Sequence, residues 1–223
     1  MKMRVVLAAV VMVGIAGGLA MGEGKGADTR AAATGAASQA AGKVTFFGVE
    51  TRGVGRVAFV LDHSGAMFDS FDFLRQELAN SVKGLSPTQK FAVVSFSEAA
   101  DELFPKDNKW VAAGDEAKRD LEKWISGVKA RGENCGMLDC YLSGIKVALE
   151  MNPPPDVVYF LTDGPFDRRL AAEVGKRNPG KKVKIQTMMF VGSWKDAEED
   201  LKKMAAENGG TYKFVAVEDL GGK

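Results

Sequence analysis

The sequence predicts an α/β fold in which a doubly wound, mostly parallel central sheet is covered by helices on both faces. Short apolar runs alternate along the chain with longer segments whose apolar residues recur at helical spacing. The runs are apolar at nearly every position, as in strands that are buried on both faces. The chain has 223 residues, of which 46% are hydrophobic, so it can build the core that such a sheet requires.

In the first half of the alternating region, apolar runs predict strands and apolar residues at helical spacing predict helices. The predicted strands are Val44–Glu50, Arg56–Leu61, Lys90–Phe96 and a short edge strand at Asp101–Phe104. The predicted helices are Phe68–Leu85 and Asp115–Lys129. In the first of these helices the spacing places Phe68 on the inward face, in line with Phe71 and Leu74.

The second half repeats the alternation. The predicted helices are Leu138–Glu150, Phe166–Arg177 and Lys195–Glu207. The predicted strands are Asp156–Thr162, Val183–Val191 and Thr211–Val217. Three consecutive prolines stop the first helix at Glu150, Pro179 follows the second, and Gly209-Gly210 ends the third. Regular strand–helix alternation of this kind is typical of a parallel sheet with helices on both faces.

The composition divides the chain into three segments. Residues 1–22 read as a signal peptide or an N-terminal membrane anchor, because Lys2 and Arg4 precede an uncharged, mostly apolar stretch over residues 5–22. Residues 23–42 form an Ala/Gly-rich flexible linker, and residues 43–223 form the folded domain. We therefore expect an exported protein of the periplasm or cell envelope, which contacts a membrane only through residues 5–22 if that segment is not cleaved.

Composition and motifs argue against several functions. With 30 basic and 29 acidic residues the formal net charge is +1, which does not favour a nucleic-acid binder. A Ser-His-Asp or Cys-His enzyme would have to use the single histidine, His63, and no G-x-S-x-G elbow is present. A D-x-D phosphatase loop and a G-x-G-x-x-G nucleotide turn are also missing after the first apolar strand. We predict that the chain is not an enzyme.

Ligands bind beyond the carboxyl ends of the strands in such sheets, so the residues that follow each strand are the candidate site. Asp62, His63 and Ser64 follow one strand, and Asp163 lies in a Thr-Asp-Gly sequence after another. Two carboxylates and a hydroxyl in one crevice suggest an oxygen-liganded divalent cation. In the alternative interpretation, Asp62 and Asp163 only cap loops and helix starts, as aspartate commonly does.

Four landmarks, in order along the chain, resemble the von Willebrand factor type A (VWA) domain family over about residues 52–220. Val57–Met67 resembles the family's first strand and its D-x-S-x-S loop. Gly136–Asp139 falls where the family has a loop such as Gly-Gly-Thr-Asp, and Val157–Gly164 resembles the strand that ends in Thr-Asp-Gly. Leu201–Tyr212 resembles the closing helix and its Gly-Gly turn.

The resemblance implies a metal-ion-dependent adhesion site, in which oxygen ligands hold Mg²⁺ or Mn²⁺ and an acidic group of a protein partner completes the coordination. Asp62, Ser64 and Asp163 match the family's ligand positions. Ala66 replaces the second serine and Leu138 replaces the loop threonine, and neither side chain offers an oxygen. We therefore expect an interaction module with weak or no metal binding. The alternative is a functional site in which water replaces the two lost hydroxyls.

The same resemblance implies that a protein partner docks on the loops after these two strands. The residues expected on this partner-binding face are His63, Met67, Asp139 and Gly164. We expect His63 to be a surface loop residue, with a pH-tuned contact or a ligand as the alternative. The partner itself is not identified by the sequence.

The sequence also contains a pair of cysteines and a basic segment. Cys135 and Cys140 bracket the altered loop and are expected either to form a small disulfide or to remain as buried thiols. Residues 168–184 contain seven basic residues and one acidic residue, Glu173. This segment is either a solvated surface or a patch for an acidic partner or an anionic surface.

Overall fold

The computed structural model describes residues 42–132, 138–164, 167–190 and 195–216. The predicted signal or anchor segment and all of the linker except Gly42 lie outside these ranges. Gly42 itself is the first residue of a strand. Within the described residues, every helix is too short or too polar to cross a membrane.

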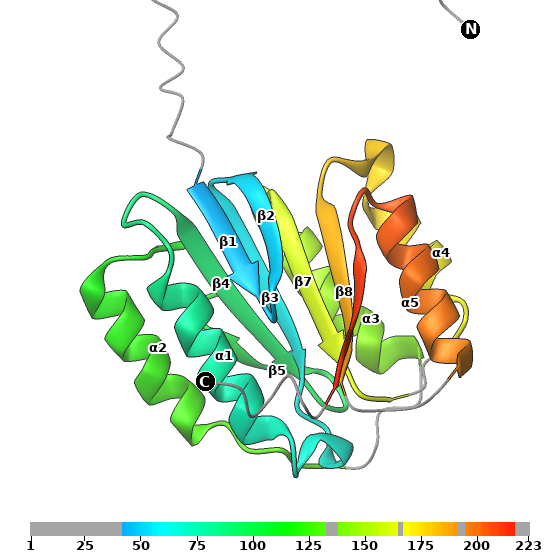
Figure 1. Ribbon diagram of the computed structural model, residues 1–223, viewed down its shortest axis with the longest axis horizontal. Coiled ribbons are helices and arrows are strands. Elements are labelled where there is room, and N and C mark those ends of the chain that lie inside the picture. Colours follow the sequence, from blue (N-terminus) through cyan, green and yellow to red (C-terminus); the bar gives the residue numbers. More distant parts are fainter. Residues whose placement is uncertain (1–41, 133–137, 165–166, 191–194, 217–223) are drawn as a thin grey trace, which may run out of the picture. The chain divides into compact units, whose positions relative to one another are not determined.

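The central sheet has seven strands, and most of its pairings are parallel, as the sequence predicts (Figure 1). The strands occur in the order β5-β4-β3-β7-β8-β9, and β6 pairs with the end of β4. Their bounds are β3 Arg56–Asp62, β4 Lys90–Phe96, β5 Ala100–Phe104, β6 Val111–Ala112, β7 Val157–Thr162, β8 Lys184–Phe190 and β9 Tyr212–Val215. Only β5 and β6 run antiparallel, both against β4.

A separate two-stranded hairpin precedes this sheet. The sequence predicts one strand over Val44–Glu50, but the structure has β1 Gly42–Phe46 and β2 Val49–Val54, joined by a tight turn at Phe47-Gly48. Both turn residues have positive φ, 44° and 74°, as a two-residue hairpin turn of this handedness requires. The prediction missed the turn because Phe47 is a bulky residue that rarely adopts such a backbone conformation.

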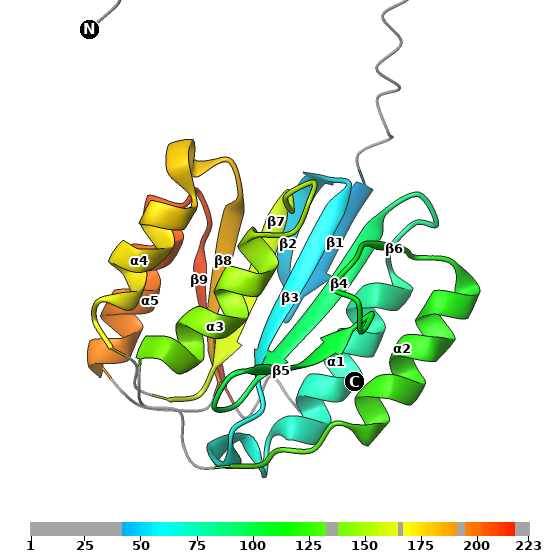
Figure 2. The same ribbon diagram turned by 180° about the vertical axis from the view of Figure 1, so that it is seen from behind.

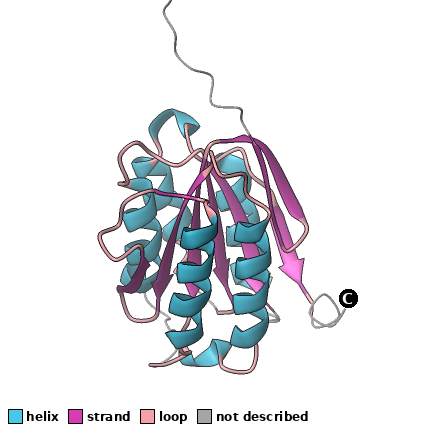
Figure 3. Cartoon of the chain, turned by 90° about the vertical axis from the view of Figure 1, so that its left-hand side faces the viewer, coloured by secondary structure: helices cyan, strands magenta, loops and turns pink. Residues whose placement is uncertain are grey.

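Five α-helices complete the described fold. They are α1 Phe71–Lys83, α2 Asp115–Gly127, α3 Leu138–Leu149, α4 Leu170–Arg177 and α5 Lys195–Glu207. The hairpin, α1 and α2 pack on one face of the sheet and form one core with the side chains of that face (Figure 1). Helices α3, α4 and α5 cover the other face and form the second core (Figure 2). Viewed from one side, the sheet strands lie between helices (Figure 3).

The start of the first helix differs from the prediction. Residues Gly65–Met67 form a short 3-10 turn, η1, and α1 begins only at Phe71. Phe68 lies between the two and has 75% of its surface exposed, although helical spacing predicted it to be buried. Because the helix starts three residues later than expected, Phe68 is not part of its inward face.

Candidate functional site

The parallel strands β3 and β7 are neighbours, so the residues that follow them meet at one edge of the sheet. Asp62, the last residue of β3, is fully buried there. Its Oδ1 accepts a 2.9 Å hydrogen bond from the backbone N–H of Ser64, and its Oδ2 accepts a 2.7 Å bond from the hydroxyl of Thr162. Burial raises the pKa of Asp62, while the bonds from Ser64 and Thr162 act in the opposite direction. The carboxylate therefore ties together the ends of two strands.

Asp163 lies next to this group and is less well satisfied. Its Oδ1 is buried and has no hydrogen-bond partner among the described residues. Burial, and then the negative charge of Asp62, raise the pKa of Asp163 to about 7. The negative charges of Asp62 and Asp163 therefore oppose one another at this edge of the sheet, and a cation would relieve that repulsion.

Tyr141, on α3, closes the same site from the second core. It is buried, and both its burial and the nearby charge of Asp62 raise the pKa of its phenol. Sequence reasoning identified neither Tyr141 nor Thr162 as part of the site. Thr162 was visible in the Thr-Asp-Gly sequence, whereas Tyr141 could be found only once α3 had been placed against β3 and β7.

The oxygen ligands that the described residues offer to a metal are few. Asp62, Ser64 and Asp163 lie at the expected edge, but Ala66 is exposed and carries no oxygen. Leu138, the first residue of α3, is partly buried against the second core and also carries no side-chain oxygen. Mg²⁺ takes six oxygen ligands, so at least three would have to come from water or a partner. No cluster of three or more His, Cys, Asp or Glu positioned to hold a metal occurs among the described residues.

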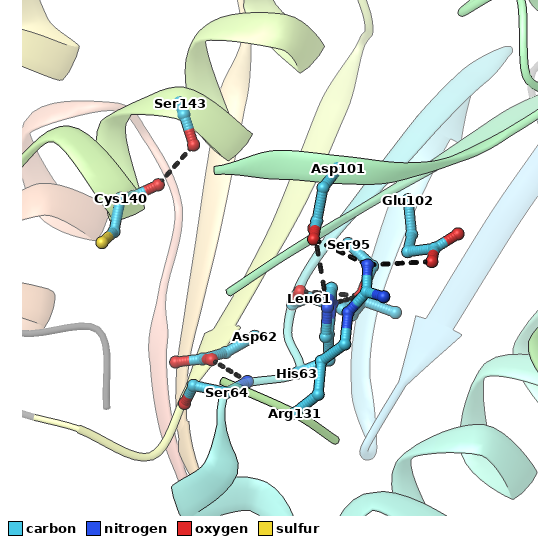
Figure 4. Close-up of polar contacts among 10 residues, drawn as sticks. All are labelled: Leu61, Asp62, His63, Ser64, Ser95, Asp101, Glu102, Arg131, Cys140 and Ser143. Carbon is cyan, nitrogen blue, oxygen red and sulfur yellow. Dashed lines mark hydrogen bonds and ion pairs between the residues drawn. The ribbon is translucent and has the colours of Figure 1, made fainter. Parts of the chain in front are cut away.

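His63 is fully buried, which corrects the expectation of a surface loop residue. Figure 4 shows its side chain beside Ser95 of β4 and Asp101 of β5. Its Nδ1 lies 2.7 Å from the hydroxyl of Ser95, and its Nε2 lies 3.5 Å from Asp101 Oδ1. Burial lowers the pKa of His63, and the charge of Asp101 opposes this shift. The backbone N–H of His63 donates to the carbonyl of Phe96 at 2.8 Å, which continues the pairing of β3 with β4 as far as this residue.

Arg131 joins this cluster to the loop that follows α2. Its guanidinium pairs with Asp101 at 2.9 Å and with Glu102 at 3.1 Å (Figure 4). Its backbone N–H donates to the carbonyl of His63 at 2.9 Å. The segment that leads into residues 133–137, which are outside the described ranges, is therefore fixed to the loop after β3.

Ser95, His63 and Asp101 resemble a serine-hydrolase triad in their order, but their environment does not suit catalysis. Ser95 and His63 are both fully buried, so a substrate cannot reach the hydroxyl. The Ser95 hydroxyl also donates to the carbonyl of Leu61 at 3.2 Å, so its single proton is already used. We interpret the cluster as a structural network.

Three of the four residues expected on the partner-binding face are buried in the structure. Met67 and Gly164 are buried, Met67 because it packs into the core beneath α1. With His63, they contribute little side-chain surface to a docking partner. Asp139 is exposed, as expected. Ala66 and Phe68, in the segment between β3 and α1, are also exposed, and the sequence prediction had placed Phe68 in the core.

The proposed disulfide involves one residue outside the described ranges. Cys135 belongs to residues 133–137, whereas Cys140 lies buried in the first turn of α3. The pairing of the two cysteines stays a prediction.

Comparison with known families identifies the class of protein. The model of the von Willebrand factor type A domain matches residues 55–214, which is more than half of the chain. The chain therefore belongs to the VWA domain family, a family of protein-interaction modules. No curated protein matches the sequence significantly.

Solved structures agree on the fold. A von Willebrand factor type A protein from Catenulispora acidiphila has 17% identity and a TM-score of 0.60, over 74% of this chain and 39% of the other. The pilus adhesin SpaC from Lactobacillus rhamnosus GG has 10% identity and a TM-score of 0.59, over 74% of this chain and 28% of the adhesin. An aerotolerance-related membrane protein from Bacteroides fragilis has 13% identity and a TM-score of 0.53, over 74% and 92%. The chain thus spans well under half of the first two proteins.

Proposed function

We propose that this chain is an extracytoplasmic, non-enzymatic interaction module that docks a protein partner on the loops after β3 and β7, with weak or no dependence on divalent metal. The observation that carries the proposal is the exposure of Phe68. Phe68, with 75% of its surface in solvent beside the altered ligand loop, is the most exposed large hydrophobic residue in the described part of the chain and would serve as an apolar anchor.

The geometry of Asp62 supports weak metal dependence. Both of its carboxylate oxygens already accept hydrogen bonds within the protein, at 2.9 Å and 2.7 Å. In family members with a metal site, two further hydroxyl side chains help to hold the ion. This chain has Ala66 and Leu138 at those two positions and so lacks both hydroxyls. Hydrogen bonds therefore hold the loop in the position that a bound ion would otherwise stabilise.

An exported location is supported by the apolar residues 5–22 and the linker that follows them. Two of the structural neighbours are named as a pilus adhesin and a membrane protein. A module held at the cell envelope by its N-terminal segment would present its loops to partners in the same compartment.

The test is site-specific photo-crosslinking in the native host. A photoreactive phenylalanine analogue is placed at position 68 of the full chain and, as a matched control, at position 214, where Phe214 is 42% exposed on β9. We expect a discrete protein adduct from position 68 that persists in EDTA and is missing from position 214. The docking proposal is wrong if position 68 gives no adduct or if both positions give the same adducts.

A second candidate is a functional Mg²⁺- or Mn²⁺-dependent adhesion module. It is favoured by the unpartnered, buried Oδ1 of Asp163 beside the charge of Asp62. In that case Asp62, Ser64 and Asp163 would hold the ion, water would replace the lost hydroxyls, and a partner carboxylate would complete the site. An adduct from position 68 that disappears in EDTA would favour this candidate over the first.

A further inference from the structure

The basic segment over residues 168–184 divides into two parts in the structure. Four of its cations are paired with three neighbouring acids. Arg168 pairs with Asp196 and Arg169 with Asp167, while Lys176 and Arg177 both pair with Glu173. The remaining three, Lys181, Lys182 and Lys184, form no ion pair with any described residue. They carry most of the positive charge of the segment that no neighbouring acid balances.

These three lysines lie at the amino edge of the sheet, opposite the candidate site. Lys184 is the first residue of β8, and Lys181 and Lys182 immediately precede that strand. The parallel strands β4 and β3 begin at the same edge, with Lys90 paired in register with Arg56. Adjacent strands are about 4.8 Å apart, so Lys90 and Lys184, three strands apart, are separated by roughly 14 Å. We call Lys90, Lys181, Lys182 and Lys184 the basic edge.

Several acidic residues lie near the basic edge, and some of them are already paired with other basic groups. The carboxylate of Asp156 accepts bonds from the backbone of Gly55 and pairs with Arg56 at 2.7 Å. The open end of the hairpin adds Lys43 and Arg52, which share Glu50 as their acidic partner. Further acids at this edge are Glu150 and Glu207, close to the ends of α3 and α5, and Asp115 and Glu116 in the first turn of α2, which follows the β6 partner of Lys90. The excess of exposed positive charge is therefore greatest at Lys181 and Lys182, which are exposed and form no ion pair with any described residue.

The chain enters the domain at this same edge. Gly42, the first described residue, pairs with Val54, which lies two residues before the start of β3. The Ala/Gly-rich linker and the apolar stretch at residues 5–22 come directly before it in the sequence. The linker therefore joins the folded domain at the edge that carries these lysines.

We propose that the basic edge binds the anionic headgroup surface of a phospholipid bilayer. This goes beyond the proposed docking function and does not depend on it, since the docking loops lie at the opposite ends of the same strands. Lysine ammonium groups are hydrated point charges that suit a diffuse layer of headgroups. Each basic residue near such a surface strengthens binding about fivefold, and one apolar segment combined with a basic patch holds a protein to a membrane more firmly than either alone.

The test compares the reactivity of individual lysines in the full chain. The protein is mixed with phosphatidylcholine vesicles or with vesicles containing 30% phosphatidylglycerol, labelled with a water-soluble acylating reagent and analysed by mass spectrometry. We expect the labelling of Lys181 and Lys182 to fall several-fold only with phosphatidylglycerol, and to recover in 0.5 M salt. Lys123 on α2 and Lys203 on α5 are exposed internal controls whose labelling stays constant.

Two matched triple variants test the same point by partition into vesicles. Replacing Lys181, Lys182 and Lys184 by Gln should abolish the preference for anionic over neutral vesicles, a loss on the order of 100-fold. Replacing Lys123, Lys129 and Lys203 by Gln removes the same charge and should leave the preference within about threefold of the unmodified chain. Equal losses in both variants would overturn the proposal. Protection of Lys181 and Lys182 by polyglutamate or an oligonucleotide, but not by vesicles, would also overturn it and assign the edge to a soluble polyanion.

Discussion

The hydroxyl of Thr162 donates a 2.7 Å hydrogen bond to Asp62 Oδ2 and so joins the carboxyl ends of β7 and β3 at the candidate site. Removing this donor in Thr162→Val leaves a fully buried carboxylate with one fewer hydrogen bond. We expect the free energy of unfolding to fall by about 1.5–3 kcal/mol. Urea denaturation measures the change. Thr162→Ser keeps the hydroxyl and is the matched control. Equal losses in the two variants would mean that the methyl group, and not the hydrogen bond, holds the strands together.

The raised pKa of Asp163 predicts that the stability of the fold depends on pH. Its pKa in the folded state is raised to about 7 from an ordinary value of 3.8, so the folded chain binds the proton more tightly than the unfolded chain. The stability that Asp163 contributes is therefore present at low pH and is lost as the pH rises from about 4 to about 7. Asp163→Asn removes this loss. In EDTA, we expect a higher urea midpoint for the variant at pH 8 and nearly equal midpoints at pH 4.5. A lower midpoint at pH 8 would show that the Asp163 carboxylate is stabilised by a partner.

The lowered pKa of His63 predicts a pH dependence of stability with the opposite sign. Burial lowers its pKa in the folded state below 6.5, so the unfolded chain binds the proton more tightly. The stability that neutral His63 contributes is full above pH 6.5 and falls as the pH decreases through that value. His63→Gln should reduce the loss of stability between pH 7 and pH 5, whatever its effect on packing. The change in urea midpoint between these two pH values is the measurement. An unchanged difference would mean that Asp101 stabilises the protonated ring.

The sequence predicts the fold class and most elements because their apolar patterns and glycine or proline stops act locally. Helix α5 begins and ends where it was expected, and the parallel order of β3, β7 and β8 agrees with the alternation. The hairpin turn at Phe47-Gly48 was missed because tertiary packing overrides the usual avoidance of positive φ by a bulky side chain. The burial of His63 was missed because it depends on Ser95 and Asp101, which approach it only through the pairing of β4 with β3 and β5.

In the candidate site, too, local sequence predicts some features and tertiary packing decides the others. The positions of Asp62, Ser64 and Asp163 follow from strand ends, which sequence reveals. The hydrogen bonds of the individual carboxylate oxygens do not follow from the sequence. They depend on neighbours from other elements, such as Thr162 on β7 and the residues of α3. Phe68 was misplaced for a local reason, since the turn at Gly65–Met67 delays the helix. Helical spacing alone cannot show where the first turn begins.

Two helical glycines should respond to alanine in opposite directions. A Cβ built on Gly144 of α3 would lie 2.6 Å from Phe96 Cδ1 in the core, whereas one on Gly175 of α4 would meet nothing within 4 Å. Alanine is the better helix former by about 1 kcal/mol. We therefore expect Gly175→Ala to stabilise the chain by up to that amount and Gly144→Ala to destabilise it by about 1–3 kcal/mol, because α3 must move away from β4. Thermal unfolding of the two variants measures both effects. Stabilisation by Gly144→Ala would mean that α3 can shift without loss of packing.

Restoring the lost hydroxyls tests how far the loops have diverged from a metal site. Ala66 is exposed, so Ala66→Ser should leave stability almost unchanged, whereas Leu138→Thr removes a side chain that packs against the second core and should lower it. We expect the double variant to bind Mg²⁺ or Mn²⁺ measurably more tightly than the original chain, because two oxygens are added to the set of Asp62, Ser64 and Asp163. Calorimetric titration of the metal-stripped chain gives the affinities. Adding Asp163→Asn to the double variant is the control that should abolish the gain. If the double variant gains nothing, the start of α3 holds residue 138 away from the site, and hydrogen bonds alone position these loops.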